Sequence, residues 1–304
     1  MRLAPVRVIW LVLPLLAGPA ASHALDGWDD APRIVATVVL WAAWGTGLVA
    51  LLAPRPVGLT IVRTIAPAFA ALAIAGAIWD EASALTALGA VASALTAAVL
   101  VADPAVAVAS ANGIAYGDEL RHPLRTPPAL YLGPIPAARA LVVGGTVAGP
   151  LLLADGQLAW GLVALVAGLV LASLALRSLQ TLARRWLILV PAGLVVLDPM
   201  TLADPVLIVR RQLRALREVD ATGPLDAGAL DLRLGATLGS VEVVLDRSLD
   251  VVRRGGRGRG GDTVHPASMV VAVAAPRALI DASSARRRVR GQAAMPPPSS
   301  ASPS

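Results

Sequence analysis

The sequence contains no cysteine and no lysine among its 304 residues. Without cysteine, disulfide bonds, thiolate nucleophiles and cysteine-ligated metal sites are excluded. All 26 basic residues are arginines, which together with abundant alanine, glycine and proline is typical of a GC-rich genome, so arginine in place of lysine carries little functional information. Charge is also scarce, at 15% of residues, whereas about 25% is usual in soluble domains. Hydrophobic residues make up 56%, and this balance is typical of an integral membrane protein.

Long apolar segments predict the part of the chain that crosses a membrane, since a spanning helix needs about 20 apolar residues. Five segments qualify: 32–53, 59–79, 82–102, 137–154 and 158–176. Arg63 lies one turn inside its segment, and Arg139 at the start of another can snorkel to the headgroups. The LGPIP stretch before the fourth segment is expected to be an extended or interfacial lead-in, because Pro134 and Pro136 oppose a helix. Residues 1–24 are either a first spanning helix or a signal peptide, since two arginines precede an apolar run with a small-residue ending.

We therefore expect an α-helical transmembrane bundle of five or six spans, with residues 32–176 as its body. When the N-terminus is placed in the cytoplasm, alternating spans put nearly all their arginines inside and the acids near Asp30, Asp80 and Asp155 outside. The C-terminal part is then cytoplasmic, and it carries the whole net charge of +6, because 17 arginines and 11 acids follow residue 180. These observations predict a multi-pass protein of a bacterial plasma membrane.

A mostly β domain is predicted after the last span. Residues 186–197 are apolar but too short to cross a membrane, and the Pro-Ala-Gly turn at their centre predicts a hairpin. Further strands are expected where apolar and polar residues alternate, in VLIVR, ALDLRLGA, SVEVVLD, SLDVV and SMVVAVAAP. Pro276 favours the start of a final helix that runs to about Arg290. Its buried residues are expected to include Ala278, Leu279 and Ile280.

The predicted boundaries place a cytoplasmic β domain with its closing helix in residues 181–290, of which 184–290 are expected to fold independently. Residues 291–304 are expected to form a disordered tail, because their composition is dominated by proline, serine and alanine.

Two stretches resemble known proteins. Spans followed by RRWLILVPAGLVVLDP, a run of strands and a closing VAAPRALIDA helix resemble membrane proteins that carry a cytoplasmic pleckstrin-homology-like β domain. This resemblance covers residues 184–290 and implies a partly open β barrel or sandwich with a C-terminal helix. The loop AYGDELRHPLRTPPALYLGP resembles a segment of uncharacterised multi-pass proteins of actinobacteria. Neither resemblance implies catalytic residues or a cofactor.

The most polar stretch between the spans is AYGDELRHPLR, residues 115–125. Its charged groups can bind a lipid headgroup or a nucleotide, and a carboxylate pair beside a histidine can ligate a divalent metal. The candidate ligand-binding residues are Asp118, Glu119, Arg121, His122 and Arg125. The alternative is a loop whose arginines set the topology and pair with its acids. We assign it no metal and no cofactor.

A second cluster of charge ends the last helix. Its members are Arg286, Arg287, Arg288 and Arg290. Bases near a cytoplasmic leaflet attract anionic lipid with about 1 kcal/mol each, and the alternative is a solvated helix end whose cations suit the helix dipole. The RRGGRGRGG stretch, residues 253–261, is interpreted as a flexible hairpin loop because it is short and has no aromatic residue. We therefore expect no nucleic-acid partner.

The predicted spans contain no acid, histidine or lysine in their interiors, which argues against a proton-coupled transporter and against an intramembrane metalloprotease or aspartyl protease. The sequence also has no nucleophile-elbow, H-E-x-x-H or Walker pattern. It favours a non-enzymatic scaffold or accessory factor of the cell envelope, with the lipid bilayer and an unidentified protein as partners. The alternatives are an enzyme that acts on a lipid or lipid-linked substrate through residues 115–125, and a transporter subunit.

Overall fold

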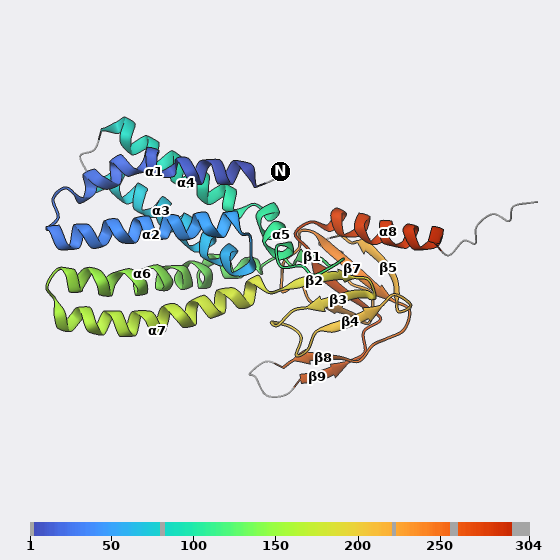
Figure 1. The fold of residues 1–304 in the computed structure, drawn as a ribbon. Helices are drawn as coiled ribbons and strands as arrows, with labels where there is room; N and C mark the ends of the chain where they lie inside the picture. Colours follow the sequence, from blue (N-terminus) through green and yellow to red (C-terminus); the bar gives the residue numbers. More distant parts are fainter. Residues whose placement is uncertain (1–2, 80–82, 221–222, 256–260, 294–304) are drawn as a thin grey trace, which may run out of the picture.

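The structure, a computed structural model, describes residues 3–79, 83–220, 223–255 and 261–293, with the backbone alone for 287–293. Within these ranges, six helices are long and apolar enough to cross a membrane. They are α1 (Ala4–Leu25), α2 (Asp30–Leu52), α3 (Pro56–Trp79), α4 (Ala84–Ala102), α6 (Pro134–Ala154) and α7 (Leu158–Ala183). Figure 1 shows them side by side, with the β-rich part of the chain at one end. The prediction of a multi-pass helical part is confirmed.

The first helix, α1, packs against its neighbours as a member of the bundle. Trp10 is fully buried, and its indole N–H donates to the carbonyl of Trp44 on α2 at 2.9 Å, while the Trp44 indole donates to the carbonyl of Trp10 at 2.8 Å. Gly47 makes room for this ring, because a Cβ there would lie 2.1 Å from Trp10. The choice between a spanning helix and a signal peptide for residues 1–24 stays a prediction.

Helices α6 and α7 form a hairpin with very close backbones. A Cβ on Gly145 would lie 2.4 Å from the carbonyl oxygen of Gly168, and one on Gly149 would lie 2.5 Å from the Cα of Leu165. Small residues let two spans approach in this way, and the contact replaces the hydrophobic effect that lipid surroundings cannot supply. The hairpin is therefore held together by packing that larger side chains would prevent.

The start of α6 differs from the sequence-based expectation. The helix begins at Pro134, so the extended alternative for the LGPIP stretch is wrong, and its interfacial position stays a prediction. Proline lacks an N–H, but the first N–H groups of a helix have no intrahelical partner, so Pro134 and Pro136 fit the first turn. At the same open end of the hairpin, α7 continues to Ala183, beyond the expected end at residue 176.

The β region consists of small sheets. Among the described residues, the first sheet has the order β1 (Leu120–Pro123), β2 (Trp186–Val190), β3 (Gly193–Leu197), β4 (Val206–Val209). The second has the order β5 (Leu213–Glu218), β7 (Ser240–Leu245), β10 (Ser268–Ala272), β6 (Ala229–Asp231). A separate hairpin pairs β8 (Val251–Arg254) with β9 (Gly261–Val264). The predicted hairpin in residues 186–197 is confirmed, whereas β1, β5 and β9 were not predicted.

Both four-stranded sheets bury side chains in one core, where Leu194, Ile208, Val243 and Met269 are fully buried. The strands that the structure describes do not close into a barrel. The mostly β character of the region is therefore confirmed, and a barrel closure is not.

The C-terminal helix α8 (Pro276–Ala293) begins at the predicted proline. Of the side chains predicted to be buried, Leu279 is fully buried in the β core and Ile280 is half-buried. Ala278 is exposed, so the prediction is wrong for this residue. The helix covers the core with Leu279, and the partly buried Ala282 packs against the same core.

One strand of the β region comes from between the spans. β1 pairs antiparallel with β2 along its whole length, and Leu124, the next residue, is buried in the same core and bridges Val273. The segment follows a short helix, α5 (Pro104–Asn112), that the sequence analysis did not predict. The expected domain of residues 181–290 is therefore completed by residues 120–124.

Candidate functional site

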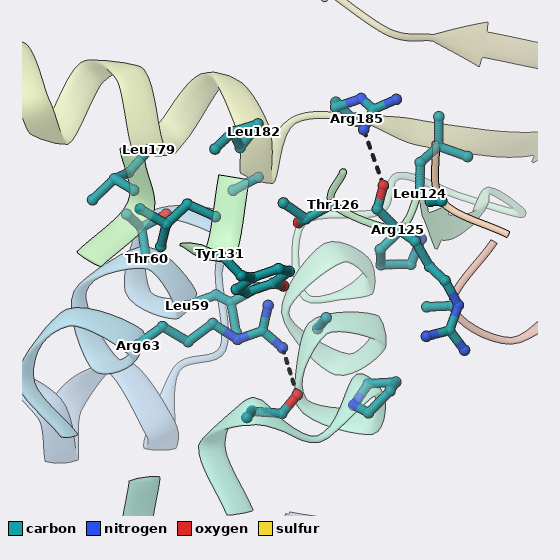
Figure 2. Close-up of a pocket in the computed structure, with 18 of the residues that line it drawn as sticks. Leu59, Thr60, Arg63, Leu124, Arg125, Thr126, Tyr131, Leu179, Leu182 and Arg185 are labelled. Carbon is teal, nitrogen blue, oxygen red and sulfur yellow. Dashed lines mark hydrogen bonds between the residues drawn. The ribbon is translucent and has the colours of Figure 1, made fainter. Parts of the chain in front are cut away.

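A cavity of about 360 Å³ lies where the helical bundle meets the β region (Figure 2). The ends of α3, α6 and α7, the short helix α5, the segment after β1 and the loop before β7 surround it. Its apolar walls include Pro56, Leu59, Ala107, Ile135, Leu179, Leu182 and Trp186. Its hydroxyl groups belong to Thr60, Thr64, Thr126, Thr237 and Tyr131, the last from the short 3-10 helix η1 (Pro128–Leu132).

The charged groups of this cavity all have one sign. Its lining contains the arginines Arg63, Arg125, Arg139 and Arg185. Among the lining residues that the structure describes, there is no aspartate, glutamate or histidine. A concave site with convergent cations and apolar walls is suited to an anion that carries an apolar portion.

Arg63 is held in place by the C-terminus of α4. Its guanidinium donates to the backbone carbonyls of Val101 and Ala102, both at 3.2 Å, and to that of Asp103 at 3.4 Å. The last carbonyls of a helix have no intrahelical donor, and the negative end of the helix dipole favours a cation there. In Figure 2 the guanidinium lies beside the ring of Tyr131. Arg63 is thus fixed at the cavity wall by the helix end.

Arg139 has neither a hydrogen bond nor an ion pair within the part of the chain that the structure describes, and its side chain is half-buried. It lies within electrostatic reach of Arg63 and of Tyr131. Asp103 also lies within electrostatic reach of Arg63, but no carboxylate forms an ion pair with either guanidinium in the described structure. The two guanidinium groups repel each other, and a bound anion would relieve that repulsion.

Arg185 differs from these residues because its charge is balanced. Its guanidinium is 1% exposed and makes two hydrogen bonds of 2.7 Å to the carboxylate of Asp198, which is fully buried. Further bonds go to the carbonyls of Arg125 at 3.0 Å and Leu232 at 3.3 Å. A buried bidentate pair with its remaining donors satisfied fixes local geometry. Arg185 therefore positions the backbone of the cavity wall.

The candidate residues predicted from the sequence separate into different surroundings. Glu119 and Arg121 form an ion pair of 2.9 Å, as the alternative interpretation of the loop expected. The guanidinium of Arg121 also lies 5.1 Å from the ring centre of Trp186, a cation–π distance. The side-chain amide of Asn112 binds the backbone N–H and carbonyl of Arg121 at 2.9 and 2.8 Å. These contacts give Arg121 a structural role at the start of β1.

His122 points into the β region. It is 6% exposed, and neither ring nitrogen has a hydrogen-bond partner within the described structure. Burial, and to a smaller extent the charge of Arg286, lowers the pKa of His122 to about 4. The Asp118 backbone carbonyl accepts a hydrogen bond from the same Arg286 guanidinium. Asp118 and His122 therefore lie on the side of α8, and the fold does not gather them with Arg125 at the cavity.

Of the five predicted residues, only Arg125 lines the cavity, and its Nε is buried without a partner in the described structure. Sequence reasoning missed Arg63, Arg139 and Tyr131 as site residues. The available signal was that two separate spans each carry an arginine near the end that is predicted to lie on the same side of the membrane. Each arginine alone is explained by snorkelling, so the signal appears only when the two helices are known to be neighbours.

The arginine cluster at the end of α8 is described only in part. Arg286 binds the Asp118 carbonyl, and the side chains of Arg287, Arg288 and Arg290 lie outside the described residues. In Figure 1, α8 begins beside the helical part and runs away from it. This direction does not favour contact of the cluster with the bilayer that the spans cross, and the lipid contact of these arginines stays a prediction.

Within the residues that the structure describes, no three histidine or acidic side chains gather as a metal site would require. No protein-family model, no curated protein and no solved structure matches this chain. The resemblance to pleckstrin-homology-like membrane proteins and to actinobacterial multi-pass proteins therefore stays a prediction.

Proposed function

We propose that this chain is a non-enzymatic scaffold of a bacterial plasma membrane that binds the anionic headgroup of a lipid between its spans and its β region. The observation that supports the proposal is the cavity of about 360 Å³ with unbalanced arginines and apolar walls. The cytoplasmic position of the β region is part of the proposal and rests on the distribution of arginine between the two sides of the spans.

A lipid fits this cavity better than a free anion does. Leu59, Ile135 and Leu179 line it from helices of spanning length, so its apolar wall continues toward the depth of acyl chains. Arg63 and Arg139 lie near the ends of α3 and α6, at the level where phosphate headgroups are expected. Guanidinium groups bind phosphate through paired hydrogen bonds, which gives geometric selectivity as well as attraction.

Binding is favoured over catalysis by the types of side chain present. The described lining offers cations and hydroxyls, and the hydroxyls of Thr60 and Thr64 donate to helix carbonyls at 3.2 and 2.8 Å. General acid–base chemistry needs a titratable group within reach of the reacting atom. Of the loop of residues 115–125, Pro123, Leu124 and Arg125 line the cavity, and neither an acid nor a histidine is among them, so the enzymatic alternative gains no supporting observation.

The first prediction concerns Arg139. In full-length protein purified in a mild nonionic detergent, native mass spectrometry should find phosphatidylglycerol retained in preference to phosphatidylcholine. Arg139→Gln should weaken phosphatidylglycerol retention about tenfold, since a hydrogen bond to a charged group contributes about 1.5–3 kcal/mol. Arg139 is chosen over Arg63 because Arg63 also binds the carbonyls at the end of α4, so its replacement would disturb that helix end as well.

The matched control is Arg33→Gln, which removes the same charge from α2 at the opposite end of the bundle, where Arg33 pairs with Asp30 at 3.0 Å. This variant should retain phosphatidylglycerol as the unmodified protein does. Equal retention of the two lipids by the unmodified protein, or equal losses in the two variants, would contradict the proposal.

A further inference from the structure

The loop between β6 and β7, residues 232–239, exposes large apolar side chains. Leu238 is 68% exposed and Leu234 is 41% exposed, although Leu232 in the same loop is fully buried. The alternation of buried and exposed leucines shows that the core does not account for the two exposed ones. Exposed apolar side chains that gather in one place, rather than singly, mark a contact with a membrane or another protein.

The backbone holds these leucines in a defined position. Leu234 has a φ of 54°, in the left-handed region that side chains other than glycine rarely adopt, and Gly235 and Gly239 follow at 83° and 73°. The loop is fixed at both ends, since the carbonyl of Leu232 accepts from Arg185 and the carbonyl of Gly239 accepts from the N–H of Val273 at 2.9 Å. A strained conformation that the surroundings maintain is a feature of functional segments.

The loop lies beside the ends of the spans that face the β region. Ala236 and Leu238 line the same cavity as Leu182 near the end of α7 and Ile135 at the start of α6. Leu238 therefore continues the apolar surface of the spans, and Leu234 is exposed in the same loop. A second exposed group lies on the same side, because Tyr131 and Leu132 of η1 immediately precede α6 and are 53% and 91% exposed. Tyrosine is enriched at the interface between bilayer and water.

We infer that the loop of residues 232–239 inserts Leu234 and Leu238 into the interfacial layer of the bilayer that the spans cross. The occupant is the lipid surface, because the loop is continuous with the ends of α6 and α7 and a bilayer is what those helices are suited to contact. The β region is then held against the membrane by this loop as well as by its covalent connections. The inference is independent of the anionic headgroup proposed for the cavity.

The absence of cysteine from the sequence permits a direct test with single spin labels. Leu238→Cys and Leu234→Cys in the full chain would each carry a nitroxide, in nanodiscs of phosphatidylcholine alone that hold one protein molecule each. The collision rates with oxygen, which concentrates in the bilayer, and with a water-soluble nickel complex are then compared. For both labels, the ratio of the oxygen collision rate to the nickel collision rate should be several-fold higher than for a label in water.

The matched control is Ser248→Cys. Ser248 is exposed and follows β7, whose first residue, Ser240, pairs with Ala272 near the cavity, so it lies beyond the opposite end of the strand. Its label should favour the nickel complex. A nickel-favouring label at Leu238 would overturn the inference, and so would a label shielded from both reagents, which would indicate cover by protein. Because the discs contain no anionic lipid, failure here is distinguishable from failure of the headgroup proposal.

Discussion

His122 places a polar ring where β1 meets an apolar core. Its two neighbours on the strand, Arg121 and Pro123, are half-buried, whereas His122 itself is buried with the core-facing Leu124. Its pKa of about 4 follows first from burial and then from the charge of Arg286. The ring is therefore neutral at pH 7, and a proton is bound more readily by the unfolded chain than by the folded one.

This difference predicts an acid sensitivity that one substitution removes. Above a pH of 6.5 neither state binds the proton, so the contribution to stability is full there. As the pH falls from 6.5 to about 4, the unfolded chain takes up the proton first, and roughly 3 kcal/mol of stability is lost. His122→Leu should flatten the fall of the thermal midpoint of the detergent-solubilised protein between pH 7 and pH 4.5.

The control is His265→Gln, because His265 is exposed and its ring lies 2.8 Å from the Asp250 carboxylate. This variant should keep the acid sensitivity that the buried histidine causes. An unchanged slope in His122→Leu would mean that the ring is already accessible to protons in the folded state.

At the scale of elements, β1 joins two parts of the chain that the sequence analysis separated. The strand supplies the outer edge of the first sheet, and Leu124 supplies part of the core. A fragment that begins after α7 would expose the backbone of β2 and leave a gap in the core. Unpaired strand edges also promote association between molecules.

We therefore expect residues 184–293 alone to be less stable than the same fragment preceded by residues 115–127 through a flexible linker. Far-ultraviolet circular dichroism with a urea titration measures the difference, and size-exclusion chromatography reports association of the shorter fragment. Leu124→Asp in the longer fragment is the control, since it keeps the strand and removes its core contact. Equal stability of both fragments would instead support the prediction that residues 184–290 fold independently.

The sequence predicted elements whose signals are local and missed those that depend on distant partners. The hairpin of β2 and β3 is marked by a turn and two apolar flanks, so it was recognised. β1 contains Pro123 and pairs with residues that follow two further spans, so no neighbouring segment indicates it. The cavity was missed for the same reason, because Arg63 and Arg139 meet only through the packing of α3 near α6.

At the scale of the whole molecule, the N-terminal end of α1, the end of α7 and the β region lie at one end of the bundle (Figure 1). The turn between α6 and α7 lies at the other end. In intact cells, a membrane-impermeant thiol reagent should label Gln157→Cys in that turn. It should label Ser248→Cys only after the membrane is permeabilised, because the arginine distribution predicts a cytoplasmic β region. Labelling of Ser248→Cys in intact cells would reverse the orientation.

The chain passes between the helices and the β region three times, before β1, after β1 and after α7, and the last two of these connections are bonded to each other. The N–H of Leu124 donates to the carbonyl of Arg185 at 2.9 Å, and the guanidinium of Arg185 donates to the carbonyl of Arg125 at 3.0 Å. Only Arg184 and Arg185 separate α7 from β2. A domain on one linker can swivel about it, whereas two linkers that are bonded together remove that rotation. A protein bound to the outer strands would therefore be held at a fixed distance from the bilayer and in a fixed orientation relative to the spans.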